Sequence, residues 1–155
     1  MIDFSGVEVP GGCEYVISAC LCGVCCRYDG KTKCIPEIRK IYDEGRAVLV
    51  CPEVMGGMPT PRKPSEIQGD RVVNSEGEDT TEFFRKGAVA VLEICLRHNI
   101  RKAILKQRSP SCGSKQVYDG SFSGRIVDGA GITASLLKEN GIEVFGEDDG
   151  IFTKF

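Results

Sequence analysis

Four short apolar runs alternate with helical segments along this chain, and this alternation constrains the fold more than any other feature. The runs that predict buried strands cover residues 14–19, 46–50, 102–106 and 142–145. The segments that predict helices cover residues 36–45, 79–98 and 129–140. Because a crossover helix returns the chain to the start of the next strand, such strands run parallel. We therefore expect an α/β fold: a three-layer, mostly parallel sheet of about four strands with crossover helices.

Residues 52–79 interrupt this alternation. The segment is rich in glycine and proline, and only Arg71–Val73 resembles a strand. We expect a long loop excursion here, and loops of this length inside compact domains tend to carry function. Further along, Asp119-Gly120 between Val117 and Phe122 predicts a small hairpin.

The composition favours chemistry based on reduced cysteines. The 155 residues are enough for one domain, 1–155, with its own core. Nine cysteines, an odd number, occur in a chain with enough Val, Ile and Leu to fold without disulfides. Reduced thiols, metal ligands or redox groups are therefore expected. The one histidine, His98, is expected to end a helix, where the helix dipole favours it.

The bulk charge of the chain is uninformative about its partners. The formal net charge is -2 with both signs interspersed, so no strongly basic face indicates nucleic acid. The first residues do not form a basic and then apolar leader, and no run approaches the roughly 20 apolar residues of a membrane span. We expect a cytoplasmic protein without a membrane segment.

Three cysteines stand at corresponding positions in the predicted fold. Cys20 and Cys51 directly follow the first two strands, and Cys112 lies in the loop after the third. The carboxyl ends of parallel strands share one edge of a sheet, so the three thiols should converge there. Three convergent cysteines suit a metal or cluster with one open position. The alternative is that they are small buried residues at strand ends.

A second interpretation groups cysteines that are close in sequence. Cys22-Gly-Val-Cys25 has the spacing of a redox pair, and Cys20, Cys22, Cys25 and Cys26 suggest a zinc knuckle. The chain lacks a second pair at the usual zinc-site spacing, and no helix pattern that would lower a thiolate pKa directly follows. Position in the fold is therefore the better guide, although the local group remains an alternative.

Several ordered motifs resemble those of the DUF523 family, which includes the thiouracil desulfidases. They are Ser18-Ala-Cys20, Cys26-Arg-Tyr-Asp-Gly30, Cys51-Pro-Glu53, Gly56-Gly-Met-Pro-Thr-Pro-Arg62, Gly69-Asp-Arg-Val-Val73, Leu105-Lys-Gln-Arg-Ser-Pro-Ser-Cys-Gly113 and Tyr118-Asp-Gly120. The match covers about residues 15–149. The resemblance implies a [4Fe-4S] cluster with three cysteine ligands, matching Cys20, Cys51 and Cys112, and one open iron.

The remaining cysteines are interpreted against the same family. Cys26 matches a family cysteine, but a fourth ligand would close the open iron, so a supporting role is expected. Cys22 and Cys25 depart from the family pattern, and Cys13, Cys34 and Cys95 fall outside the motifs. These five thiols are not expected to share in the chemistry.

The catalytic candidates lie beside the expected ligands. Glu53, two residues beyond Cys51, is expected to be the base that activates water, with Asp29 in reserve; a loop-ordering carboxylate is the alternative. Ser109 is expected to act in catalysis, while Ser111 is expected to contact substrate. Either serine could instead only form the turn before Cys112.

The expected substrate-binding residues come from the same loops. Arg27, Arg62 and Lys106 are expected to bind a pyrimidine oxygen or a nucleotide phosphate, and Tyr28 to stack on the ring. Asp29 is expected beside them. Solvated loop charges and loop packing are the alternatives.

The expected activity follows from the resemblance. It is the removal of sulfur from a thiolated pyrimidine, as a base or nucleotide, by hydrolysis at the open iron without net electron transfer. Thiolated tRNA is not excluded as a substrate. The competing functions are a non-catalytic iron–sulfur sensor or binding protein and a zinc or thiol redox module.

Overall fold

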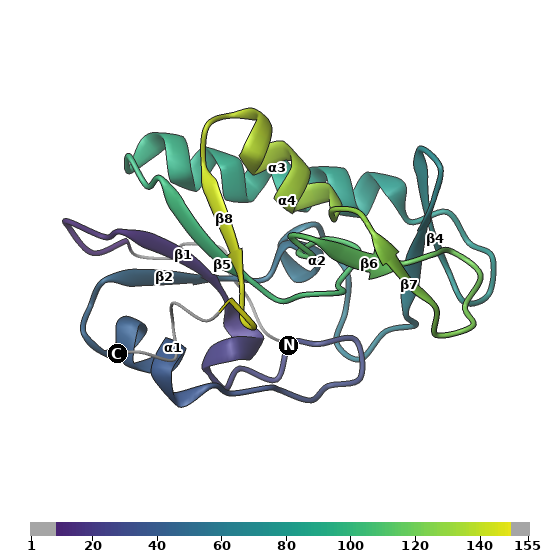
Figure 1. The fold of residues 1–155 in the computed structure, drawn as a ribbon, viewed down its shortest axis with the longest axis horizontal. Helices are drawn as coiled ribbons and strands as arrows, with labels where there is room; N and C mark the ends of the chain where they lie inside the picture. The colour runs from purple at the N-terminus through teal and green to yellow at the C-terminus, as the bar shows by residue number, and fades with distance from the viewer. Residues whose placement is uncertain (1–8, 150–155) are drawn as a thin grey trace.

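A parallel four-stranded sheet forms the centre of the protein (Figure 1). The computed structural model describes residues 9–149. The sheet consists of β1 (Tyr15–Ser18), β2 (Ala47–Val50), β5 (Lys102–Leu105) and β8 (Glu143–Gly146), in the order β2-β1-β5-β8. All three pairings are parallel, and they align Val16 with Val48 and with Ala103. The predicted parallel α/β sheet is confirmed.

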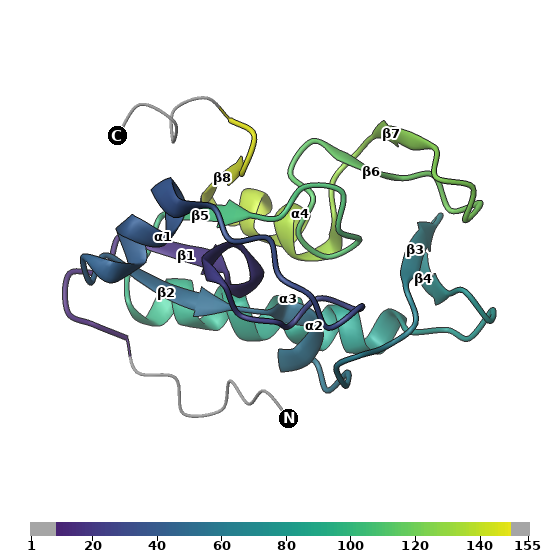
Figure 2. The same ribbon diagram turned by 90° about the horizontal axis from the view of Figure 1, so that it is seen from below.

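Helices cover both faces of this sheet, which makes three layers (Figures 1 and 2). Val16 and Leu105 pack on one face in a core cluster that includes residues of α3 (Thr81–Arg97) and α4 (Ile132–Glu139). Ile17 and Ile104 pack on the other face with α1 (Pro36–Asp43) and the short 3-10 helix η1 (Ala19–Cys22). Both faces of the strands are apolar because both are covered.

Two antiparallel hairpins lie beyond the carboxyl edge of the sheet (Figure 2). One pairs β3 (Ser65–Gln68) with β4 (Arg71–Asn74), and the other pairs β6 (Gln116–Tyr118) with β7 (Ile126–Asp128). The second is the predicted hairpin, although its return strand begins at Ile126. The first corrects the expected loop excursion of residues 52–79, because the polar run Ser65–Gln68 also forms a strand.

The longest helix begins later than the sequence pattern indicated. Asp79 Oδ1 accepts hydrogen bonds from Thr81 N at 2.9 Å and from Thr81 Oγ1 at 2.6 Å. Thr80 occupies the cap position, and Asp79 lies just before it. His98 follows the last helical residue, as expected. Among residues 9–149, no helix has the length and apolar character that crossing a membrane requires.

Close backbone contacts fix the start of the segment after β2. A short helix, α2 (Pro52–Met55), begins directly after Cys51 and packs against α3. A Cβ atom at Gly87 would overlap the carbonyl of Pro52, and one at Gly56 would overlap the carbonyl of Phe83. Glycine at both positions therefore allows α2 to lie directly on α3, which anchors Cys51 and Glu53 to the largest helix.

Candidate functional site

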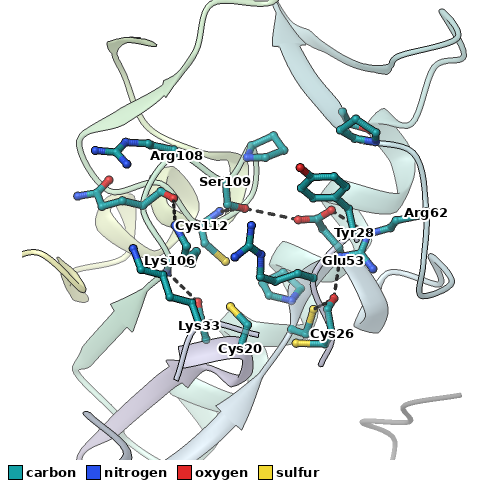
Figure 3. Close-up of a pocket in the computed structure, with 18 of the residues that line it drawn as sticks. Cys20, Cys26, Tyr28, Lys33, Glu53, Arg62, Lys106, Arg108, Ser109 and Cys112 are labelled. Carbon is teal, nitrogen blue, oxygen red and sulfur yellow. Dashed lines mark hydrogen bonds and ion pairs between the residues drawn. The ribbon is translucent and has the colours of Figure 1, made fainter. Parts of the chain in front are cut away.

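A cavity of about 670 Å³ opens at the carboxyl edge of the sheet. Its walls come from the loops after β1, β2 and β5 and from the two hairpins beyond them. Figure 3 shows the side chains that face it. The location is that expected for a ligand site of a parallel α/β sheet, and the volume is in the usual range for small-molecule pockets.

The three cysteines that follow the strands all line this cavity. Cys20 belongs to η1, Cys51 caps α2, and Cys112 lies in the loop after β5. All three are buried. The structure thus brings together thiols that are up to 92 residues apart in the chain (112 minus 20).

Cys26 adds a fourth thiol to the same wall, as the sulfur atoms in Figure 3 illustrate. Hydrogen bonds from its thiol to Cys20 and Cys51, together with burial, raise the pKa of Cys26. The hydrogen bond from Cys26 lowers the pKa of Cys51, although burial opposes this. Burial raises the pKa of Cys112, while a hydrogen bond with Ser18 acts the other way. These four residues are called the cavity thiols below.

The arrangement of the cavity thiols bears on what they can hold. Among residues 9–149, no three His, Cys, Asp or Glu side chains are grouped so as to hold a metal ion. The four thiols of the local zinc-knuckle alternative have different surroundings, because Cys25 is exposed whereas Cys20, Cys22 and Cys26 are buried. Thiols on separate loops around a larger space fit a cluster of several irons, in which each cysteine binds a different iron.

Glu53 and Ser109 lie next to each other in the wall of the cavity (Figure 3). Ser109 Oγ lies 3.4 Å from Glu53 Oε2 and accepts hydrogen bonds from the backbone N–H groups of Ser111 and Cys112, both at 3.1 Å. The pair therefore joins the loop after β2 to the loop after β5. A carboxylate and a hydroxyl in this arrangement can accept and pass on a proton.

Arg62 holds Glu53 in place. Its Nε lies 3.1 Å from Glu53 Oε1, and its guanidinium also donates to the carbonyls of Cys26 and Pro59, both at 3.0 Å. The Arg62 side chain is only 5% exposed. With its donors directed to the protein, Arg62 orients the Glu53 carboxylate and the backbone of Cys26.

Lys106 is also engaged by the protein. Its Nζ lies 3.1 Å from Glu147 Oε2 and donates to the carbonyl of Gln107 at 2.9 Å. Glu147 Oε1 in turn accepts the backbone N–H of Gln107 at 2.6 Å. Lys106 lines the cavity, so its ammonium is held at the wall by a buried carboxylate.

Arg27 and Tyr28 line the cavity as predicted, whereas Asp29 and Ser111 do not. Asp29 pairs with Arg27 at 3.6 Å and accepts the N–H of Lys31 at 3.0 Å. The Ser111 hydroxyl is buried against Thr133 Oγ1 at 2.7 Å. Neighbouring loop residues such as Tyr28 and Asp29 therefore differ in whether they line the cavity, and loop sequences carry no period that reveals this.

The sequence interpretation missed several residues that line the cavity: Lys33, Glu66, Gln107, Arg108, Tyr118 and Phe122. Arg108 lies in the quoted motif beside Ser109, and its φ of 67° marks a tight turn there. Glu66 and Phe122 belong to the hairpins, which the sequence pattern did not predict to cover the site. Gln107, Arg108 and Tyr118 lie inside motifs named above, and this is the signal that could have identified them.

Fold and site together define a class: α/β proteins with a cavity of buried thiols at the carboxyl edge of a parallel sheet. The family model described as 2-thiouracil desulfurase matches residues 15–149. The chain belongs to this family, which confirms the predicted membership.

Two relatives extend this comparison. The chain is 42% identical over 144 residues to the uncharacterized protein YbbK of Bacillus subtilis (strain 168), covering 86% of this chain and 95% of that protein. It also resembles the solved structure of the [4Fe-4S]-dependent thiouracil desulfidase TudS (DUF523Vcz) with a TM-score of 0.85 and 48% identity. That match covers 88% of this chain and 91% of TudS.

Proposed function

We propose that this protein is a [4Fe-4S]-dependent desulfidase that converts the C=S group of a thiolated pyrimidine to C=O and releases hydrosulfide. The observation that carries the proposal is the convergence of three buried cysteines from three strand ends on a cavity that also contains Glu53 and Ser109. Membership of the 2-thiouracil desulfurase family and the likeness to TudS support it.

Cys20, Cys51 and Cys112 would hold the cluster. Their thiolates supply soft sulfur ligands from three directions, which suits iron–sulfur ligation. When bound, the cluster would supply an iron without a cysteine ligand, a Lewis acid with affinity for the sulfur of the substrate. Cys26 would support Cys20 and Cys51 through the hydrogen bonds described above.

Glu53 would act as the general base. Its Oε2, next to Ser109 Oγ, would take a proton from water as the water oxygen bonds to the ring carbon that carries sulfur. The carbon–sulfur bond then breaks with its electron pair on sulfur, which leaves as hydrosulfide. One proton of water ends on hydrosulfide and the other is released, so no electron donor or acceptor is needed. Ser109 would orient the water, and Arg62 would position Glu53.

Tyr28, Arg27 and Lys106 would bind the substrate from the cavity wall. Tyr28 is exposed at the mouth, where its ring can stack on a pyrimidine. Arg27 and Lys106 would contact an oxygen of the base or a phosphate. Asp29 and Ser111 would not contact the substrate directly. Asp29 would instead pair with Arg27, and Ser111 would hold its loop against Thr133 of α4. The substrate would be a small thiopyrimidine or its nucleotide in the cytoplasm.

The test is hydrosulfide release by anaerobically reconstituted protein. We expect stoichiometric uracil and hydrosulfide from 2-thiouracil or 4-thiouracil, without added reductant. The Cys25→Ser variant is the matched control, because Cys25 follows Cys20 closely in sequence but is exposed. Iron-loaded protein that releases no hydrosulfide from thiolated bases or nucleotides would contradict the proposal and favour a non-catalytic iron–sulfur protein.

A further inference from the structure

Glu66 is a buried carboxylate that lines the cavity on the side of the hairpins. It is 8% exposed and belongs to β3. Its Oε1 accepts two backbone N–H groups from the loop between β6 and β7, Gly120 at 3.0 Å and Phe122 at 3.1 Å. One oxygen of this carboxylate therefore fastens one hairpin to the other.

The contact between the hairpins is close enough to fix the direction of the Glu66 side chain. A Cβ atom at Gly120 would lie 2.6 Å from the carbonyl oxygen of Ile67, and the φ of Gly120 is +94°. Gln68 Nε2 donates to the Gly120 carbonyl at 2.7 Å. Since glycine alone fits this approach and this backbone conformation, the loop is held against β3 and Oε1 stays occupied.

The second oxygen, Oε2, has no hydrogen-bond or ion-pair partner among residues 9–149. This oxygen is also not completely buried. Because Glu66 lines the cavity, this oxygen is available to whatever occupies it. A carboxylate oxygen can only accept hydrogen bonds, so it selects for an N–H or O–H donor.

The position of Glu66 relative to the cavity thiols indicates which part of a substrate it meets. The thiols lie where the strands end, whereas β3 and the β6–β7 loop lie further out (Figure 2). A ring whose sulfur points to the thiols therefore presents its opposite edge toward the hairpins. Tyr118 and Phe122 line the same side and provide aromatic surface for a flat ring.

We propose that Glu66 is a specificity-determining residue that accepts a hydrogen bond from an N–H or O–H group of the substrate on the side away from the sulfur. This inference rests on the proposed desulfidase function and adds a recognition element to the same cavity. The donor is a ring N–H in a free base or a sugar hydroxyl in a nucleoside, and Oε2 suits both.

The Glu66→Gln variant tests this role with little disturbance of the fold. The glutamine carbonyl can accept the same two backbone N–H groups, so the hairpins stay joined. The amide NH₂ then replaces Oε2 and turns an acceptor into a donor. If Glu66 only joined the hairpins, the Glu66→Gln variant would keep nearly the wild-type KM. If Glu66 also accepts a hydrogen bond from the substrate, the substrate's N–H or O–H group now meets another donor and KM rises.

The substrates are chosen to locate the donor. In 4-thiouracil, ring atom N1 lies opposite the C4 that carries sulfur, while in 2-thiouracil both N–H groups flank the C–S carbon. 4-Thiouridine replaces the N1 proton with a sugar. Glu78→Gln is the matched control, because Glu78 is exposed and lies outside the cavity.

We expect Glu66→Gln to raise KM for 4-thiouracil or 4-thiouridine about 10- to 100-fold, as for loss of a hydrogen bond to a charged group. A rise with 4-thiouracil identifies the ring N–H, and a rise with 4-thiouridine alone identifies the sugar hydroxyl. KM for 2-thiouracil, the melting temperature and the visible absorbance of the cluster should not change.

Two results would overturn the inference while the desulfidase function stands. One is an active variant with unchanged KM for both 4-thio substrates, and the other is an equal rise for all substrates including 2-thiouracil. A wild-type protein that turns over none of these compounds would instead overturn the proposed function, and this inference with it. Failure of the Glu66 inference can therefore be distinguished from failure of the proposed function.

Discussion

The chain contains two groups of cysteines that come from overlapping stretches of sequence but have different surroundings. The cavity thiols, Cys20, Cys26, Cys51 and Cys112, are buried around one cavity. The outer thiols, defined here as Cys22, Cys25 and Cys34, lie outside that cavity: Cys22 is buried in η1, and Cys25 and Cys34 are exposed. Spacing along the chain groups Cys22 with Cys25. Position at the end of a parallel strand instead groups Cys20 with Cys51.

The outer thiols show why proximity in sequence is a poor guide here. The backbone N–H of Ile35 donates to the carbonyl of Leu21 at 2.9 Å, which brings Cys34 alongside Cys22. Arg39 Nη1 donates to the carbonyl of Cys22 at 2.7 Å. None of the outer thiols lines the cavity described above. A cysteine that directly follows a parallel strand lies at the edge of the sheet where ligands bind, because the carboxyl ends of the strands share that edge.

The largest effect is expected from Cys51→Ser. Serine removes a soft ligand, so the variant should lose its cluster absorbance and release no detectable hydrosulfide from thiouracil. Iron content and hydrosulfide release, measured after anaerobic reconstitution, check this. Cys25→Ser should match wild type in both. Loss of the cluster in Cys25→Ser with retention in Cys51→Ser would reverse the assignment of the two groups.

Glu53→Gln should separate holding the cluster from doing the chemistry. The amide cannot take a proton from water, so kcat should fall by about 10²- to 10⁴-fold while iron content stays at the wild-type level. Single-turnover assays with matched iron loading measure this. Glu44→Gln, which changes an exposed carboxylate on the side of α1, is the control. A fully active Glu53→Gln enzyme would remove Glu53 from the proposed mechanism.

Ser109→Ala should have a smaller effect on rate and a measurable effect on stability. The substitution leaves the N–H groups of Ser111 and Cys112 without their acceptor and removes the contact with Glu53. We expect kcat to fall about tenfold and the free energy of unfolding to fall by about 1–3 kcal/mol. Chemical denaturation and steady-state kinetics test the two parts. A lower stability with unchanged kcat would indicate that Ser109 only orders the loop.

The smallest effect on turnover is expected from alkylation of the outer thiols. Cys25 and Cys34 are exposed and should react with iodoacetamide at pH 8, whereas burial raises the pKa of Cys22 to about 12. A raised pKa keeps the Cys22 thiol protonated at this pH, and the thiolate is the reactive form, so Cys22 should react slowly. Mass spectrometry of iron-loaded protein identifies the labelled sites. Rapid labelling of a cavity thiol would contradict the distinction between the cavity thiols and the outer thiols.

The sheet and its helices were predictable because apolar runs and helical periodicity are local signals. The strand predicted at 46–50 occurs at Ala47–Val50, and the helix predicted at 79–98 occurs at Thr81–Arg97. β3 was missed, since Ser65–Gln68 contains one apolar residue and is held by pairing with β4. Such pairing is a tertiary effect that no local pattern reveals.

The site was predictable only where a residue's place followed from a strand end or a motif. Cys20, Cys51 and Cys112 line the cavity because each follows a parallel strand. Ser111 does not, because the loop backbone turns its hydroxyl toward Thr133. Glu66 reaches the cavity through contact between two hairpins that are separate in the chain, so it could not be assigned before the fold was known.

The central claim is that three cysteines hold an iron–sulfur cluster whose remaining iron is open to the sulfur of a substrate. Mössbauer spectroscopy of protein reconstituted with isotopically enriched iron tests it most directly. We predict that one iron site of the four in the cluster shifts when 4-thiouracil is added under anaerobic conditions, while the other three do not. A spectrum in which thiouracil changes none of the four sites, or a protein that binds no iron, would contradict the account.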